Sequence, residues 1–194
     1  MELIRIENNI IRNNNFFERE EDSASINIFG QRAIIMFAGT FQTLAKSIEN
    51  VIGQRQAEGV LYDAGINSGR CSAKILLKSW EERGNDFLQK WAKFYESSGV
   101  GWFKVKNIEV DLDTGEGTVR IENPFVIKKY GISACFQDLL EYNDKELFCK
   151  TCCHFLSGFI VGMLKELTNK KLECDEIVYG TEEDLFCEFK IKPY

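Results

Sequence analysis

The segment Cys152-Cys153-His154-Phe155-Leu156-Ser157-Gly158-Phe159-Ile160-Val161-Gly162-Met163 decides how the rest of the chain folds. At helical spacing, Cys153, Leu156 and Ile160 fall on one face, while Gly158 and Gly162 stack four residues apart on the opposite side. Apolar or small residues therefore surround the helix axis, which predicts a buried helix that other elements cover on two sides. We expect the cysteines of this helix to face a hairpin formed by the strands that follow it.

The composition is that of an ordinary soluble domain. With 194 residues, of which 44% are apolar and 28% charged, the chain is long enough to bury a sizeable core. A net charge of -6 without a lysine or arginine stripe argues against nucleic-acid binding. The uncharged run 155–164 is about half as long as a membrane span, and the N-terminus shows no secretory signal. We therefore expect a cytoplasmic protein that binds neither nucleic acid nor membranes.

Seven cysteines and a single histidine, His154, limit the chemistry that the chain can perform. In a cytoplasmic protein, buried thiols or a metal site are expected rather than disulfides. A helix turns adjacent side chains about 100° apart, so Cys153 and His154 are poorly placed for a catalytic pair. The sequence also has no phosphate-binding or dinucleotide-binding glycine loop. These features point away from catalysis.

Hydrophobic periodicity predicts the remaining elements. Apolar residues at helical spacing predict helices, and alternating residues around turn signals predict two hairpins. The expected helices are 41–53, 54–80 with interruptions at Gly65 and Gly69, and 86–97, and the expected strands are 100–110, 118–122, 171–179 and 185–191. Because helices and hairpins are segregated along the chain, the fold class is α+β, an antiparallel sheet with a helical layer.

We expect residues 1–194 to form one domain. Residues 1–28 predict an N-terminal strand or hairpin followed by a loop, and the core is expected over residues 29–192. The apolar run Arg32–Phe37, which ends near Gly39, is typical of a short buried strand.

A group of cysteines and a carboxylate is a candidate metal site. Cys174 and Glu176 share one face of a strand, and Cys187 lies on the returning strand of the same hairpin. Cys153 on the central helix completes a set of three thiolates and a carboxylate, which suits a structural zinc ion without an open position. The alternative is that these cysteines are small apolar residues of the core.

Several motifs resemble the 4-vinyl-reductase domain family. The resemblance rests on Cys153-x4-Gly158-Phe159-x2-Gly162, then Glu176, then Cys187-Glu188-Phe189, with weaker support from Gly99-Val100-Gly101 and Thr118–Asn123. It spans roughly residues 30–192. It implies kinship with the sensor domains of phenol- and toluene-responsive transcription activators, and a ligand-binding fold shared with subunits of the vesicle-tethering TRAPP complex.

The resemblance also implies a zinc site. Cys153, Glu176 and Cys187 match three of the ligands expected in the phenol sensors, whereas Tyr179 stands where the fourth, a cysteine, is expected. Cys174, two residues before Glu176, is the neighbouring thiol that would have to substitute for it. The predicted ligand set is therefore Cys153, Cys174, Glu176 and Cys187, with zinc as a structural cofactor.

A pocket for a small, apolar or aromatic molecule is a further implication of the resemblance. Fifteen Phe, three Trp and six Tyr can line such a pocket. The candidate ligand-binding residues are Trp102, Phe103, Phe155 and Phe159, and the alternative for each of them is ordinary core packing.

The resemblance therefore predicts a small-molecule sensor domain without catalysis of its own, which acts as a homodimer and passes its signal to a separate protein partner. One alternative is an accessory protein or reductase of tetrapyrrole or cofactor metabolism. The other alternative is a scaffold subunit.

Overall fold

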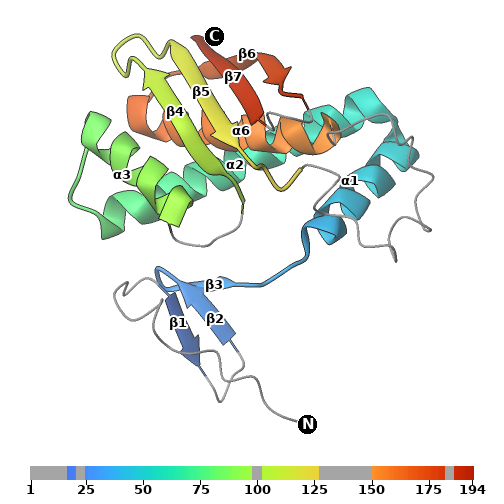
Figure 1. Cartoon of the computed structure of the whole chain (residues 1–194), viewed down its shortest axis with the longest axis horizontal. Coiled ribbons are helices and arrows are strands. Elements are labelled where there is room, and N and C mark those ends of the chain that lie inside the picture. Colours follow the sequence, from blue (N-terminus) through green and yellow to red (C-terminus); the bar gives the residue numbers. More distant parts are fainter. Residues whose placement is uncertain (1–16, 21–24, 98–101, 127–149, 182–185) are drawn as a thin grey trace. The chain divides into compact units, whose positions relative to one another are not determined.

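The computed structural model describes residues 17–20, 25–97, 102–126, 150–181 and 186–194, and it divides the chain into two compact units, Met1–Met36 and Phe37–Tyr194 (Figure 1). In the first unit, β1 (Phe17–Glu20), β2 (Ser25–Ile28) and β3 (Gln31–Ala33) form an antiparallel sheet in that order. The prediction that Arg32–Phe37 forms a short buried strand is wrong. Strand β3 ends at Ala33, and the side chains of the next four residues are exposed because no described residue covers them.

Four helices are described in the second unit, and they confirm the helical periodicity of the sequence. They are α1 (Ala38–Ile52), α2 (Gln54–Ser79), α3 (Gly84–Ser97) and α6 (Lys150–Thr168). The break between α1 and α2 lies at Gly53, whose φ of 84° is a conformation that L side chains rarely adopt. The predicted interruptions at Gly65 and Gly69 are wrong, because α2 runs through both residues as one helix.

The second unit also contains a four-stranded antiparallel sheet in the order β4-β5-β7-β6. Strands β4 (Lys104–Val110) and β5 (Gly117–Glu122) form the first predicted hairpin, and β6 (Leu172–Tyr179) and β7 (Phe186–Pro193) form the second. Strand β7 joins the two hairpins by pairing with β5. The predicted α+β class, an antiparallel sheet with a helical layer, is confirmed.

Helix α6 forms the centre of the second unit, as its sequence predicts. Every residue from Thr151 to Leu164 is buried except His154. α6 contacts β6 and packs along α2, and its two glycines allow the close approach to α2. A Cβ at Gly158 would overlap the backbone of Tyr62, and one at Gly65 of α2 would overlap the backbone of Phe155. The backbones of α2 and α6 therefore lie in direct contact where the two helices cross.

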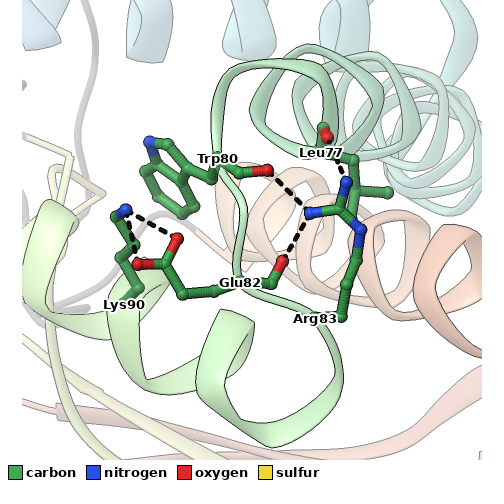
Figure 2. Close-up of polar contacts among 5 residues, drawn as sticks. All are labelled: Leu77, Trp80, Glu82, Arg83 and Lys90. Carbon is green, nitrogen blue, oxygen red and sulfur yellow. Dashed lines mark hydrogen bonds and ion pairs between the residues drawn. The ribbon is translucent and has the colours of Figure 1, made fainter.

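The connection from α2 to α3 is fixed by one arginine (Figure 2). The Arg83 guanidinium donates hydrogen bonds to the carbonyl oxygens of Leu77 (3.0 Å), Trp80 (2.7 Å) and Glu82 (2.6 Å). A cation that binds the last carbonyls of a helix is also favoured by the helix dipole. The Glu82 carboxylate accepts two bonds from Lys90 of α3, at 2.7 and 2.8 Å, so the start of α3 is held as well.

Candidate functional site

The four predicted ligand-binding residues lie together in the second unit. Phe155 and Phe159 are one turn apart on α6, and Trp102 and Phe103 lead into β4. The Trp102 ring centroid lies 5.9 Å from that of Phe155 and 5.2 Å from that of Phe159. The Phe103 and Phe159 centroids are 6.5 Å apart. The fold therefore brings together residues that are more than fifty positions apart in sequence, although their role in binding stays a prediction.

Four more rings extend this group from other parts of the chain. Phe41 of α1 lies 5.0 Å from Phe155 and 5.2 Å from Phe125, which follows β5. On α3, Trp91 and Tyr95 are one turn apart with centroids 5.2 Å from each other. The eight rings, here called the aromatic cluster, are Phe41, Trp91, Tyr95, Trp102, Phe103, Phe125, Phe155 and Phe159. The four added rings were not among the ligand-binding residues predicted from the sequence, although the spacing of Trp91 and Tyr95 already indicated one helix face.

Buried polar groups fix the geometry at two edges of the aromatic cluster. Gln42 of α1 is fully buried, and its side-chain amide donates a 2.9 Å hydrogen bond to the carbonyl oxygen of Phe125. The Phe125 N–H in turn donates to the Trp102 carbonyl at 2.8 Å, which ties the two ends of the first hairpin together. On the α3 side, burial raises the pKa of Tyr95, so its phenol group stays neutral. All eight members of the cluster are uncharged.

Two of the four predicted metal ligands, Cys153 and Cys187, lie near the same tyrosine. Cys153 of α6 and Cys187 of β7 are fully buried, and Tyr179 of β6 lies directly opposite Cys187 in the strand register. The Tyr179 side chain is hydrogen-bonded with Cys153, and burial, followed by the nearby Cys153 and Cys187, raises the pKa of its phenol. The two thiols thus converge around Tyr179, and this group of three residues is here called the thiol site.

Cys174 lies away from the thiol site. It pairs with Ile191 on β7, four residues beyond Cys187, which at about 3.3 Å per residue is roughly 13 Å. A bulge between Cys174 and Glu176 shifts the register, and the Cys174 N–H donates to the Tyr62 hydroxyl of α2 at 3.2 Å. Glu176 is paired with Lys190 through the backbone, but its side chain lies outside the described part of the chain.

The side chains that the structure describes do not fit the predicted zinc site. Tetrahedral zinc takes four donors at about 2.0–2.3 Å, and a tyrosine with a raised pKa is a poor donor because it keeps its proton. Within the described residues there is no group of three or more His, Cys, Asp and Glu residues that could hold a metal ion. Zinc binding stays a prediction that metal analysis has to test.

His154 lies on a different side of α6 from the thiol site. Its Nε2 atom is 3.8 Å from a carboxylate oxygen of Glu58 on α2. Burial lowers the pKa of His154, and the Glu58 carboxylate raises it by a smaller amount. The histidine is therefore a polar residue paired across α2 and α6. Among the described helices, none is long and apolar enough to cross a membrane.

Comparison with known proteins shows the family to which this chain is related. The family model described as "Activator of aromatic catabolism" matches residues 14–111, half of the chain. The crystal structure of the phenol-responsive sensory domain of the transcription activator PoxR with phenol superposes with a TM-score of 0.67 and 16% identity, over 95% of this chain and 87% of that domain. No curated protein matches this sequence.

Two further solved structures show weaker likeness. One is a trafficking protein particle complex subunit 3 from Naegleria fowleri covalently bound to palmitic acid (TM-score 0.48, 15% identity, 81% of this chain and 96% of that one). The other is a vinyl-4-reductase family protein from Methanocaldococcus jannaschii (TM-score 0.45, 16% identity, 84% of each chain). The predicted kinship with sensor domains of aromatic-responsive activators is confirmed by the family match, and the chain belongs to the family of activators of aromatic catabolism.

Proposed function

We propose that this chain is a sensor domain that binds a small aromatic compound within the aromatic cluster. The observation that carries the proposal is the convergence of rings from α1, α3, the entry to β4, the end of β5 and α6. Rings within 7 Å favour edge-to-face and offset contacts, and an aromatic ligand would make the same contacts. The family match and the phenol-responsive domain of similar fold support the same class of ligand.

Calorimetric titration with phenol tests the proposal. We expect saturable binding by the wild-type chain and at least tenfold weaker binding by Phe159→Leu, which removes a ring at the centre of the cluster. The matched control is Phe87→Leu, because Phe87 is equally buried but contacts Trp80 instead of the cluster. If wild type shows no binding, or if both variants lose affinity equally, the cluster is not the ligand site.

We further propose that the domain acts as a homodimer through α1. Leu44 and Val51 are seven residues apart on α1, so they lie on one helical face, and they are 53% and 83% exposed. Phe37, the residue before the helix, is 81% exposed. An apolar stripe with this spacing is suited to pack against the same stripe of a second copy. Burial of these side chains in a symmetric helix pair would remove the cost of exposing them to water.

Light scattering coupled to size exclusion measures the oligomeric state directly. Wild type should elute as a dimer, and Leu44→Glu should shift it toward the monomer, because two carboxylates would be buried in the symmetric interface. Val60→Glu is the control, since Val60 is 50% exposed on α2, outside the stripe. A monomeric wild type, or a dimer that Leu44→Glu leaves intact, would exclude this interface.

A further inference from the structure

Helix α1 buries little apolar surface against the rest of the second unit. Its buried residues are Gly39, Gln42 and Ala45, and none of them has a large apolar side chain. The free energy gained by burial grows with the apolar area removed from water, so these three residues add little of it. The buried residues of α6, in contrast, include phenylalanines, leucines, an isoleucine and a methionine. Helix α1 is therefore held less firmly in the fold than α6.

Both ends of α1 are exposed connections. At its C-terminal end, the exposed Gly53 is the single residue between α1 and α2. A glycine joint changes its backbone angles at low cost, which is the property that a hinge needs. At the N-terminal end, no side-chain hydrogen bond caps the helix, and residues 34–37 before it are exposed. The helix therefore lies between a hinge and an uncovered connection.

Polar bonds fix the position of α1 on the fold. The buried Thr151 of α6 donates a 2.9 Å hydrogen bond from its hydroxyl to a carboxylate oxygen of Glu49. The Gln42 amide, nearer the other end of α1, donates to the carbonyl oxygen of Phe125 at 2.9 Å. Water replaces the lost partner on each side once α1 moves away, so the net cost of breaking such bonds is small. They define a closed position that α1 is able to leave.

We propose that α1 is a hinged cover of the aromatic cluster, which opens at Gly53 while α2, α6 and the sheet stay folded, and that the bond between Thr151 and Glu49 is its latch. Because α1 carries Phe41, its opening takes one ring out of the cluster and uncovers the neighbouring Phe155. A separate helix of 15 residues is marginal in water, so α1 also unwinds when it leaves the fold. Covers of this kind come from the least stable parts of a fold. The opening is a property of the free protein and does not depend on which ligand the cluster binds.

Amide hydrogen exchange followed by NMR measures this opening. In wild type, the α1 amides should exchange together, with protection factors at least about a hundredfold lower than those of the α6 amides. In Thr151→Val, which removes the hydroxyl and keeps the shape, protection of α1 should fall about fivefold, because the lost bond exists only while α1 is closed. Thr168→Val is the matched control. The Thr168 hydroxyl donates to the Leu164 carbonyl within α6, so its loss should lower the protection of α6 and leave that of α1 unchanged.

Three results would overturn the inference. If the α1 amides are as protected as those of α6, or if both variants lower the protection of α1 equally, α1 unfolds only together with the core. If protection decreases stepwise toward the ends of α1, the helix frays and does not open as a unit. If α1 opens as a unit but Thr151→Val leaves its protection unchanged, the latch is wrong. Should Thr151→Val not fold, Glu49→Met removes the same bond from the α1 side with a residue of similar helix propensity, and the same fivefold fall is expected.

Discussion

At the scale of single residues, we propose that Tyr179 determines whether the thiol site binds zinc. Its neutral phenol is hydrogen-bonded with Cys153 and lies opposite Cys187, at the position where the metal-binding pattern requires a third cysteine. Replacing Tyr179 by Cys would put a thiolate next to two existing thiols. We expect Tyr179→Cys, purified with zinc, to hold about one zinc per chain by metal analysis, and wild type to hold less than about 0.2.

Tyr179→Phe is the control for this experiment, because it removes the hydroxyl without adding a ligand. It should leave the zinc content unchanged and lower the free energy of unfolding by about 1 kcal/mol through loss of the hydrogen bond with Cys153. A wild-type protein that already carries one zinc per chain would show that the site is complete with Tyr179 in place.

Glu82 provides a residue-scale prediction about pH. The hydrogen bond from Lys90 lowers the pKa of Glu82 below its ordinary value of 4.5. A group whose pKa is lower in the folded state stabilises the fold fully above its unfolded pKa, and this contribution is lost as the pH falls through the folded pKa. An NMR titration of the Glu82 carboxyl should therefore give a midpoint below 4.5. In Lys90→Met the midpoint should return toward 4.5, and an unchanged midpoint would rule out Lys90 as the cause.

At the scale of elements, the contact between α2 and α6 depends on glycines. In Gly65→Ala, the new Cβ would overlap the backbone of Phe155, so the helices have to move apart and the buried side chains around them lose contacts. We expect the free energy of unfolding in urea to fall by about 1–3 kcal/mol or more. The overlap is with backbone atoms, so no side-chain rotation can relieve it.

Gly59 is the matched control for this substitution, because it lies on the same helix and a Cβ there would meet no atom within 4 Å. Gly59→Ala should raise the free energy of unfolding by about 0.5–1 kcal/mol, since alanine loses less backbone entropy in a helix. If both substitutions had the same effect, close packing of α2 on α6 would not be a determinant of stability.

The same helix pair shows where a single sequence is informative and where it is not. The burial of α6 and the two hairpins follow from periodicity, which is a local property of the chain. The predicted breaks at Gly65 and Gly69 were wrong because the reason for these glycines lies on another helix. Cys174 illustrates a second limit, since the bulge beside it changes the strand register, and alternation alone does not reveal a bulge.

At the scale of the whole molecule, the α+β class and the family relationship could be predicted from the sequence, whereas the exposure of the apolar run 34–37 could not. As a sequence, the apolar run 34–37 is compatible with a buried strand and with an exposed connection. The structure decides for the exposed connection, because no described residue covers these side chains. The family match at 14–111 spans parts of both units, but every ring of the aromatic cluster lies in the second. Ligand binding should therefore stabilise the second unit.

Thermal unfolding tests this coupling between the aromatic cluster and the stability of the second unit. A ligand that binds only the folded state at a hundred times its dissociation constant adds about 2.7 kcal/mol to the free energy of unfolding. For a chain of this length, that corresponds to a rise in Tm of roughly 5–10 °C. Wild type with saturating phenol should show this rise in far-UV circular dichroism, because α6 contributes rings to the cluster and also forms the centre of the helical core. Phe159→Leu at the same phenol concentration should show little or no rise, and an equal rise in that variant would mean that phenol stabilises the fold from another site.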